Sequence, residues 1–422
     1  MTIRRLRMKR ILKSIPLLIC FLALCLVGFY SVLWSDWIEQ INIRKTQQTD
    51  EGQDFSNSEI DLADSNMVFN DVLKVARKTL IVVSHGRSGS TLMGDIFNHH
   101  PSVFYMYEPL QSIRRVHTNL KPHSDYNDLA KDFLAGIFRC RFDSPELLAD
   151  IEEFYRKPDH PRVSNAIASP PLCPYKTSDE RWDQRLCPTM TSESLGSACR
   201  EHYEMTVLKV LVDRVPNNDI GSILEACDTK DTNCRIIFLV RDPRAVIASA
   251  HSVGFFRDNH GNPARLGTRE FSYWACKKTE DNLDSIRKLP KSLHSRIKLQ
   301  RYEDLALDPL KELSALYEFA GLSVLESVRT WLNGTTRQSR SACNHAQDGE
   351  EATCTKDDAW VAANRWRWKV HPHEIDVIEH YCRSVMLLMG YRPVDRSHEL
   401  LANIKIPLFS RNFEAKRWFL HS

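Results

Sequence analysis

Short apolar runs rich in β-branched residues alternate with amphipathic segments along most of the chain. Helical patterns lie between these runs, for example at residues 91–98 and 245–251. Strands that alternate with helices predict an α/β domain with a parallel sheet flanked by helices. Four runs have the length and composition of buried strands, at residues 79–83, 206–212, 236–240 and, more weakly, 297–300.

One stretch near the N-terminus has a different pattern. Residues 15–34 carry no charge, and about 20 apolar residues in a helix span a bilayer core of roughly 30 Å. The basic residues that precede the stretch favour a cytoplasmic N-terminus. A cleaved signal peptide is the alternative, but its apolar region would be shorter and would end at small residues. Because Trp34, Asp36 and Trp37 stand there instead, the pattern predicts one uncleaved transmembrane signal anchor.

The anchor divides the chain into four predicted parts. These are a cytoplasmic tail at residues 1–14, the transmembrane anchor at 15–34, a stem at 35–77 and a lumenal domain at 78–422. The stem is rich in Gln, Asp, Ser and Asn, which is typical of a solvated spacer. We therefore expect a single-pass type II membrane protein with its globular domain in the lumen.

Composition narrows the class of protein further. Of the 422 residues, 42% are hydrophobic and 26% are charged, which is ordinary for a globular protein and excludes a disordered chain, a collagen and a multi-span membrane protein. Lys and Arg number 57 against 54 Asp and Glu, a net charge of +3. A charge so near zero gives no support for binding nucleic acid, which needs a concentrated basic surface.

The cysteines fit an oxidising compartment. There are 12, and in a lumenal domain they suggest disulfides whose connectivity cannot be read from spacing. Cys227 with Cys234, and Cys343 with Cys354, are local guesses. The absence of any CxxC pair argues against a zinc site. The segment between Cys140 and Cys199 is expected to be an insertion, and Asn333 begins a glycosylation sequon.

The most informative segment follows the first predicted strand and opens a predicted helix. It reads SHGRSGSTLM at residues 84–93. Its glycines allow a tight turn close to a ligand, and a helix start offers free N–H groups to an anion. Arg87 adds a forked cation. This is a phosphate-loop design, but no Lys precedes Ser90 or Thr91 as in the loop of nucleotide triphosphatases. A Ser/Gly turn that only caps a helix is the alternative.

A second basic turn follows the strand predicted at residues 236–240. Its sequence RDPRAVIAS places Arg241 where open α/β sheets bind ligands. Asp242 is suited to cap the next helix and Pro243 to its first turn. Ser249 lies about two helical turns further on, so it reaches the same phosphate as Arg241 if the helix runs alongside the ligand. An Arg–Asp pair that only caps the helix is the alternative.

Taken together, the two segments resemble the Golgi carbohydrate sulfotransferases, in particular the family that sulfates the carbon-six hydroxyl of galactose, N-acetylgalactosamine or N-acetylglucosamine. HGRSGST resembles that family's 5′-phosphosulfate loop and RDPRAVIAS its 3′-phosphate motif. Three further segments match in order, FYMYEPL at residues 104–110, RYEDL at 301–305 and FAG at 319–321. The resemblance implies a P-loop-like sheet in a Golgi enzyme. It also implies in-line transfer of sulfonate from 3′-phosphoadenosine 5′-phosphosulfate to a glycan or proteoglycan, without a metal.

The resemblance also implies roles for individual residues. Arg87 is the candidate to stabilise charge as the S–O bond breaks. The 5′-phosphate and sulfonate would be held by His85, Gly86, Arg87, Ser88, Gly89, Ser90 and Thr91. The 3′-phosphate motif comprises Arg241, Asp242, Pro243, Arg244, Ala245, Val246, Ile247, Ala248 and Ser249.

The general base and the acceptor contacts rest on weaker signals. Glu108 is the candidate general base, because it matches the family's EP position, which is proposed to face the acceptor. A loop carboxylate in a salt bridge is the alternative. His85, His99 and His100 are rival bases, the last two being expected at a helix end. The acceptor contacts are candidates that also fit a structural ion pair, namely Lys209 inside an apolar run and Arg214 after it.

In the C-terminal third of the chain, the sequence predicts mainly helices. Residues 360–390 should be largely helical, and 302–304 should fix a turn before a helix at 307–319. Residues 366–369, WRWK, resemble a KWR-type position of the family that could pack on sugar or donor, although a helix with a buried and an exposed face is favoured.

Two other function classes stay as alternatives. A P-loop kinase would need a Lys beside the loop Ser or Thr and a Mg²⁺ ion. A lumenal glycan-binding protein with an inactive sulfotransferase fold is opposed by the presence of Arg87, Arg241 and Ser249. The acceptor sugar, its linkage and the oligomeric state remain open, with a homodimer among the alternatives.

Overall fold

The computed structural model describes residues 76–117, 124–157, 164–227, 232–253, 267–337, 358–411 and 413. The predicted cytoplasmic tail and anchor, all but two residues of the predicted stem, and the guessed Cys343–Cys354 pair lie outside these residues. Within them, no helix combines the length and the apolar character needed to cross a bilayer.

A five-stranded sheet in the order β2-β3-β1-β4-β5 forms the centre, and each neighbouring pair of strands is parallel. The predicted parallel sheet is therefore confirmed. Leu80 to Val83 of the central strand have no exposed surface, because a strand between two parallel neighbours is covered on both faces. The strands are β1 (Arg77–Ser84), β2 (Val103–Tyr107), β3 (Met205–Leu211), β4 (Thr232–Val240) and β5 (Ile297–Arg301).

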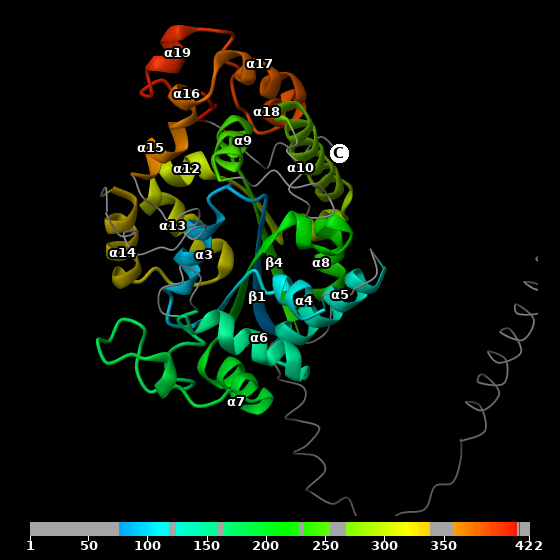
Figure 1. Ribbon diagram of the computed structural model, residues 1–422, viewed down its shortest axis with the longest axis vertical. Coiled ribbons are helices and arrows are strands. Elements are labelled where there is room, and N and C mark those ends of the chain that lie inside the picture. Colours follow the sequence, from blue (N-terminus) through cyan, green and yellow to red (C-terminus); the bar gives the residue numbers. More distant parts are fainter. Residues whose placement is uncertain are drawn as a thin grey trace, which may run out of the picture. The chain divides into compact units, whose positions relative to one another are not determined.

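Helices cover both faces of this sheet (Figure 1). On one side lie α3, α12, α13 and α14, and on the other α5, α8 and α10. The helices are α3 (Ser90–Asn98), α4 (Leu110–Val116), α5 (Ser124–Phe138), α6 (Pro145–Tyr155), α7 (Ser192–Ser197), α8 (Ile220–Cys227), α9 (Pro243–Ser252), α10 (Thr268–Lys288), α11 (Lys291–His294), α12 (Tyr302–Leu307), α13 (Pro309–Ala320), α14 (Glu326–Arg337), α15 (Ala359–Asn364), α16 (Trp366–Lys369), α17 (Pro372–Tyr381), α18 (Arg383–Leu388) and α19 (His398–Ala402).

The sequence missed some elements and misread another. Strand β2 was not predicted, because its sequence VFYMY is short and mostly aromatic. Residues 302–304 do not form a turn but begin α12, which is followed by α13 after Asp308. The four other strands, the helices after β1 and β4, and the helical character of residues 360–390 are confirmed.

Four disulfide bonds cross-link the described part of the chain. The guessed pair Cys227–Cys234 is present. Cys140–Cys199 closes the segment that was expected to be an insertion, and Cys276–Cys382 joins α10 to the start of α18. The fourth bond, Cys173–Cys187, lies inside the insertion. Disulfides of this kind are usual in an oxidising compartment.

Candidate active site at the carboxyl edge of the sheet

The turn between β1 and α3 depends on a glycine. Gly89 has a φ of 81° and occupies the N-cap position of α3, where it offers no side chain to accept a hydrogen bond from the first turn. A Cβ at this position would lie 2.2 Å from Cδ2 of Tyr302, so the ring of Tyr302 fills the space that a side chain would need. The uncapped start of α3 leaves backbone N–H groups of its first turn without intrahelical acceptors. Such a helix start is suited to bind an anion.

Two arginines and a serine meet beside this turn, although they come from the two separate sequence motifs. Nε of Arg87 donates a hydrogen bond to Oγ of Ser249 at 3.1 Å. Nη1 of Arg241 donates to the carbonyl oxygen of Arg87 at 2.9 Å, and its Nη2 donates to that of Ala362 at 2.8 Å. Within the described residues, the buried Nε of Arg241 has no hydrogen-bond partner.

The electrostatics of this corner favour an anion. Burial and the neighbouring charge of Arg241 both lower the pKa of the Arg87 guanidinium. Two like charges that are partly removed from water repel each other until a counter-charge arrives. Arg241 also lies over the ring of Tyr302, with 4.7 Å between the guanidinium carbon and the ring centroid. A phosphate placed between Arg87 and Arg241 would offset their repulsion.

The rest of the RDPRAVIAS segment builds α9. As expected, the Asp242 carboxylate caps the helix by accepting from the N–H of Arg244 at 2.9 Å, and Pro243 opens the first turn. The guanidinium of Arg244 does not face the site. It is fully buried, paired with Asp242 and Glu379, and bonded to the carbonyl of Arg392. We therefore assign Arg244 to joining α9 with the C-terminal helices, although it is part of the predicted 3′-phosphate motif. Ala245, Val246 and Ile247 are buried, whereas Ala248 and Ser249 are half-buried.

Glu108, Lys209 and Arg214 form one cluster. Glu108 follows β2, and its N–H donates to the carbonyl of Lys209, which lies in β3, at 2.6 Å. One carboxylate oxygen of Glu108 pairs with Nζ of Lys209 and the other with Nη1 of Arg214. Glu108 has a φ of 49°, which costs energy for a residue other than glycine and is often associated with functional sites. The salt-bridge alternative for Glu108 and the ion-pair alternative for Lys209 both describe what is observed.

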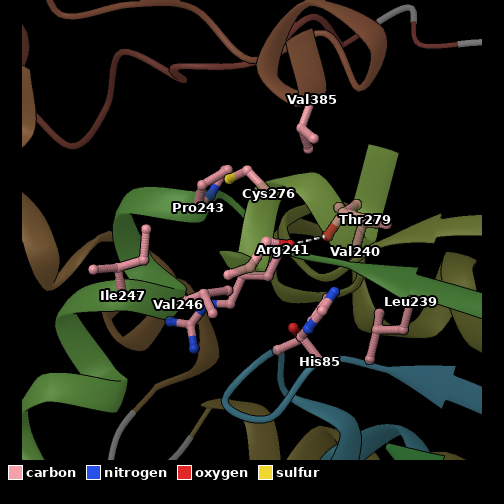
Figure 2. Close-up of a pocket in the computed structure, with 12 residues that line it drawn as sticks. His85, Leu239, Val240, Arg241, Pro243, Val246, Ile247, Cys276, Thr279 and Val385 are labelled. Carbon is pink, nitrogen blue, oxygen red and sulfur yellow. Dashed lines mark hydrogen bonds between the residues drawn. The ribbon is translucent and has the colours of Figure 1, made fainter. Parts of the chain in front are cut away.

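His85 faces a cavity between β4, α9, α10 and α18 (Figure 2). The cavity holds about 340 Å³, part of it open to solvent. The Nε2 atom of His85 is buried without a hydrogen-bond partner in the described part of the chain. Burial lowers the pKa of His85, and Lys278 adds to that effect while Asp213 opposes it. Most of the remaining lining is apolar, including Leu239, Val246, Ile247, Cys276 and Val385.

The other two candidate histidines lie away from this edge. His99 caps the carboxyl end of α3 and stacks on Trp331 with ring centroids 3.7 Å apart. His100 approaches the carbonyl of Ser323 through Nε2 at 3.2 Å. Helix α3 has 9 residues, which places its end about 13 Å from its start. The expectation that both histidines form the helix end is confirmed.

Residues 366–369, which could have packed on the sugar or the donor, contact other parts of the protein instead. Trp366 is buried beneath the Arg244 guanidinium, whose carbon lies 4.3 Å from the ring centroid. Arg367 donates to the carbonyls of Leu400, Asn403 and Ile406, which supports the helix alternative for residues 366–369. Asn333 is exposed on α14. No cluster of three or more His, Cys, Asp or Glu side chains suited to a metal occurs among the described residues.

The sequence missed the contribution of α12. Tyr302 packs on Gly89 and beneath Arg241. The buried carboxylate of the next residue, Glu303, accepts from the N–H of Asp242 at 3.0 Å. The RYEDL motif was the available signal, but nothing in it shows that two of its side chains reach the turns after β1 and β4.

Comparison with known proteins places the chain in a family. The sequence profile of the sulfotransferase family matches residues 79–326. Carbohydrate sulfotransferase 1 of Danio rerio is 28% identical, covering 79% of this chain and 82% of the relative. Carbohydrate sulfotransferase 6 of Homo sapiens is 29% identical, covering 79% and 86%. The solved sulfotransferase domain of the Synechococcus PCC 7002 olefin synthase has 18% identity and a TM-score of 0.37, covering 72% of this chain and 95% of the domain. Because the family profile spans more than half of its 422 residues, the chain belongs to the sulfotransferase family and is a sulfonate-transferring enzyme.

Proposed function

We propose that this enzyme transfers sulfonate from 3′-phosphoadenosine 5′-phosphosulfate to the carbon-six hydroxyl of galactose, N-acetylgalactosamine or N-acetylglucosamine in a glycan or proteoglycan. The choice of a carbohydrate acceptor is supported by the relatives, which are named carbohydrate sulfotransferases. The choice of carbon six rests on the resemblance of the loop and the 3′-phosphate motif described above.

The meeting of Arg87, Arg241 and Ser249 at the glycine turn carries the donor assignment. The donor has anionic groups at the 5′ and 3′ positions of its ribose, and each of the two motifs offers an arginine. Residues of the loop from His85 to Thr91 would hold the 5′ end. Ser249 and Arg241, whose Nε has no partner among the residues that the structure describes, would hold the 3′-phosphate. The residues present therefore fit the donor.

The cluster around Glu108 supports the acceptor end. During transfer the acceptor oxygen forms a bond to sulfur, the bond from sulfur to the 5′-phosphate oxygen breaks, and the acceptor proton must leave. Glu108 would take that proton when one of the two cations that pair with its carboxylate moves away from it. Arg87 would offset the charge that develops on the leaving phosphate. Lys209 and Arg214 would contact the acceptor only if they partly leave Glu108.

The proposed location follows from the N-terminal sequence. A signal anchor at residues 15–34 would place the catalytic domain in the Golgi lumen as a single-pass type II membrane protein. The disulfides are usual for an oxidising lumen, and the exposed Asn333 is available for glycosylation.

A transfer assay tests the whole proposal. Purified enzyme is incubated with ³⁵S-labelled donor and a panel of glycans, and the labelled product is mapped by disaccharide analysis. The expected result is label on carbon six of one of the three sugars. Label on another carbon would correct the position. Tight binding of ATP with no binding of 3′-phosphoadenosine 5′-phosphate would refute the donor.

A further inference from the structure

Glu303 occupies a buried position between two distant parts of the chain. Only 4% of its surface is exposed. One carboxylate oxygen accepts from the N–H of Asp242 at 3.0 Å, and the other accepts from the hydroxyl of Tyr391 at 2.8 Å. Both oxygens are therefore used, one by the turn after β4 and the other by the segment after α18. A buried carboxylate with such donors is well satisfied while it is ionised.

The turn that Glu303 holds is the one that presents Arg241. Asp242 follows Arg241 directly, and its side chain caps α9. Tyr302, which precedes Glu303, packs on Gly89 and beneath Arg241. The first two residues of α12 thus position the donor loop and the Arg241 turn together. A change at Glu303 reaches the donor site through one hydrogen bond.

The surroundings of Glu303 make its charge sensitive to a nearby anion. Burial raises the pKa of Glu303 to about 7, Asp242 adds to this, and Arg241 opposes it. Near neutral pH the carboxyl group is therefore present in both forms. Other charged or titratable groups adjoin this network or interact with its residues: Tyr302, Tyr391, Arg301, Arg244, Arg365 and Asp358.

We propose that Glu303 is a positioning residue for the nucleotide, which fixes the Arg241 turn and, through its charge, sets how tightly an anionic nucleotide binds there. This inference rests on the proposed donor site. Ionised Glu303 attracts Arg241 and repels a phosphate, so it competes with the nucleotide. Protonated Glu303 still accepts from the N–H of Asp242 and can donate to the hydroxyl of Tyr391, so the turn is kept while the competing charge is lost.

The sign of the pH dependence follows from linkage. A bound anion disfavours ionised Glu303, so binding raises the pKa of this carboxyl further. Proton uptake then accompanies binding, and affinity increases as the pH falls from 8 to 6. A rise of half a unit to one unit from a pKa of about 7 corresponds to about a threefold to fivefold change in affinity between these two pH values.

The test measures the Kd of 3′-phosphoadenosine 5′-phosphate by calorimetry at pH 6 and pH 8. Glu303→Gln keeps the shape and the bond from the N–H of Asp242, and its NH2 group donates to the hydroxyl of Tyr391 as the protonated carboxyl group would, but it cannot ionise. The Kd of wild type should exceed that of Glu303→Gln by about threefold to fivefold at pH 8 and match it at pH 6. Comparing the two proteins at each pH removes the titration of the nucleotide's own phosphates. Asp304→Asn is the matched control, since Asp304 lies on the same helix and pairs with Arg301 instead. It should lower the Tm, because Arg301 is buried, but keep the wild-type change of Kd between the two pH values.

Three results would count against these assignments. A ratio of wild-type to Glu303→Gln Kd that is the same at both pH values would overturn the inference alone. Weaker binding by Glu303→Gln at both pH values, with a lowered Tm, would show a purely structural role and would also overturn it. Wild-type protein that binds no nucleotide at either pH would overturn the proposed donor site, and the inference with it.

Discussion

Arg87→Ala removes one of the two guanidinium groups that meet at the turn after β1. The substitution leaves the backbone strain unchanged, since Arg87 has a φ of 68° and alanine pays a similar cost there. It also leaves Gly89 and the contact of Tyr302 in place. The variant therefore isolates the charge and the hydrogen bonds of one side chain.

The structure allows the effect on binding and on stability to be separated. Loss of a charged hydrogen-bond donor to a phosphate costs about 1.5–3 kcal/mol, or about 10-fold to 150-fold in nucleotide affinity. Loss of the bond from Arg87 to Ser249 costs the unliganded protein about 1 kcal/mol. Relief of the repulsion between Arg87 and Arg241 offsets part of that cost. The Tm should therefore change by only a few degrees.

Catalysis should suffer more than nucleotide binding. If Arg87 stabilises charge as the sulfur–oxygen bond breaks, its loss costs a further factor of about 10²–10³ in kcat. The assay combines ³⁵S transfer, calorimetry with 3′-phosphoadenosine 5′-phosphate, and thermal unfolding. Arg181→Ala is a suitable control, since Arg181 is exposed and pairs with Asp179. Arg87→Ala with wild-type kcat and Kd would remove Arg87 from the donor site and refute this reasoning.

Three further substitutions test the site. Gly89→Ala should abolish nucleotide binding and lower the Tm, because the new Cβ meets the ring of Tyr302; a variant with wild-type affinity would show that the turn can shift freely. Glu108→Gln should lower kcat by a factor of about 10²–10⁴ and leave the nucleotide Kd unchanged. It should also lower the Tm, because Lys209 and Arg214 lose their counter-charge. An unchanged kcat would mean that another residue is the base. Ser249→Ala should weaken nucleotide binding by about threefold to tenfold, and equal affinity of wild type for nucleotides with and without the 3′-phosphate would contradict its role.

The strands and turns that carry the site could be predicted because they depend on neighbours in sequence. A buried β-branched run followed by glycines and a helix cap is a local pattern, and it located Arg87 and Arg241. The bond between Arg87 and Ser249 spans 162 residues, and it depends on how α9 lies over the turn after β1. The pair Cys276–Cys382, 106 residues apart, was unpredictable for the same reason.

Glu108 and Arg244 show two further limits. The sequence gave Glu108 as the candidate base but no sign that Lys209 and Arg214 converge on it, since that requires β2 beside β3. Arg244 lies in the same motif as Arg241, so sequence reasoning treated the two alike. Arg244 lies in the first turn of α9 and is fully buried, whereas Arg241 precedes the helix, in the turn directly after β4.

The order of strands suggests a direction for the proposed reaction. Glu108 follows β2, and Lys209 lies in β3 near its carboxyl end. The Arg87 turn follows β1, Arg241 follows β4 and Tyr302 follows β5. These groups therefore lie along the carboxyl edge in the sheet order β2-β3-β1-β4-β5. Neighbouring strands lie about 4.8 Å apart, so the Glu108 end lies about 10 Å from the central turn and the Arg241 end about 5 Å on its other side. A donor whose sulfonate sits at the central turn would extend its 3′-phosphate toward β4, which leaves the β2–β3 side for the acceptor and its proton.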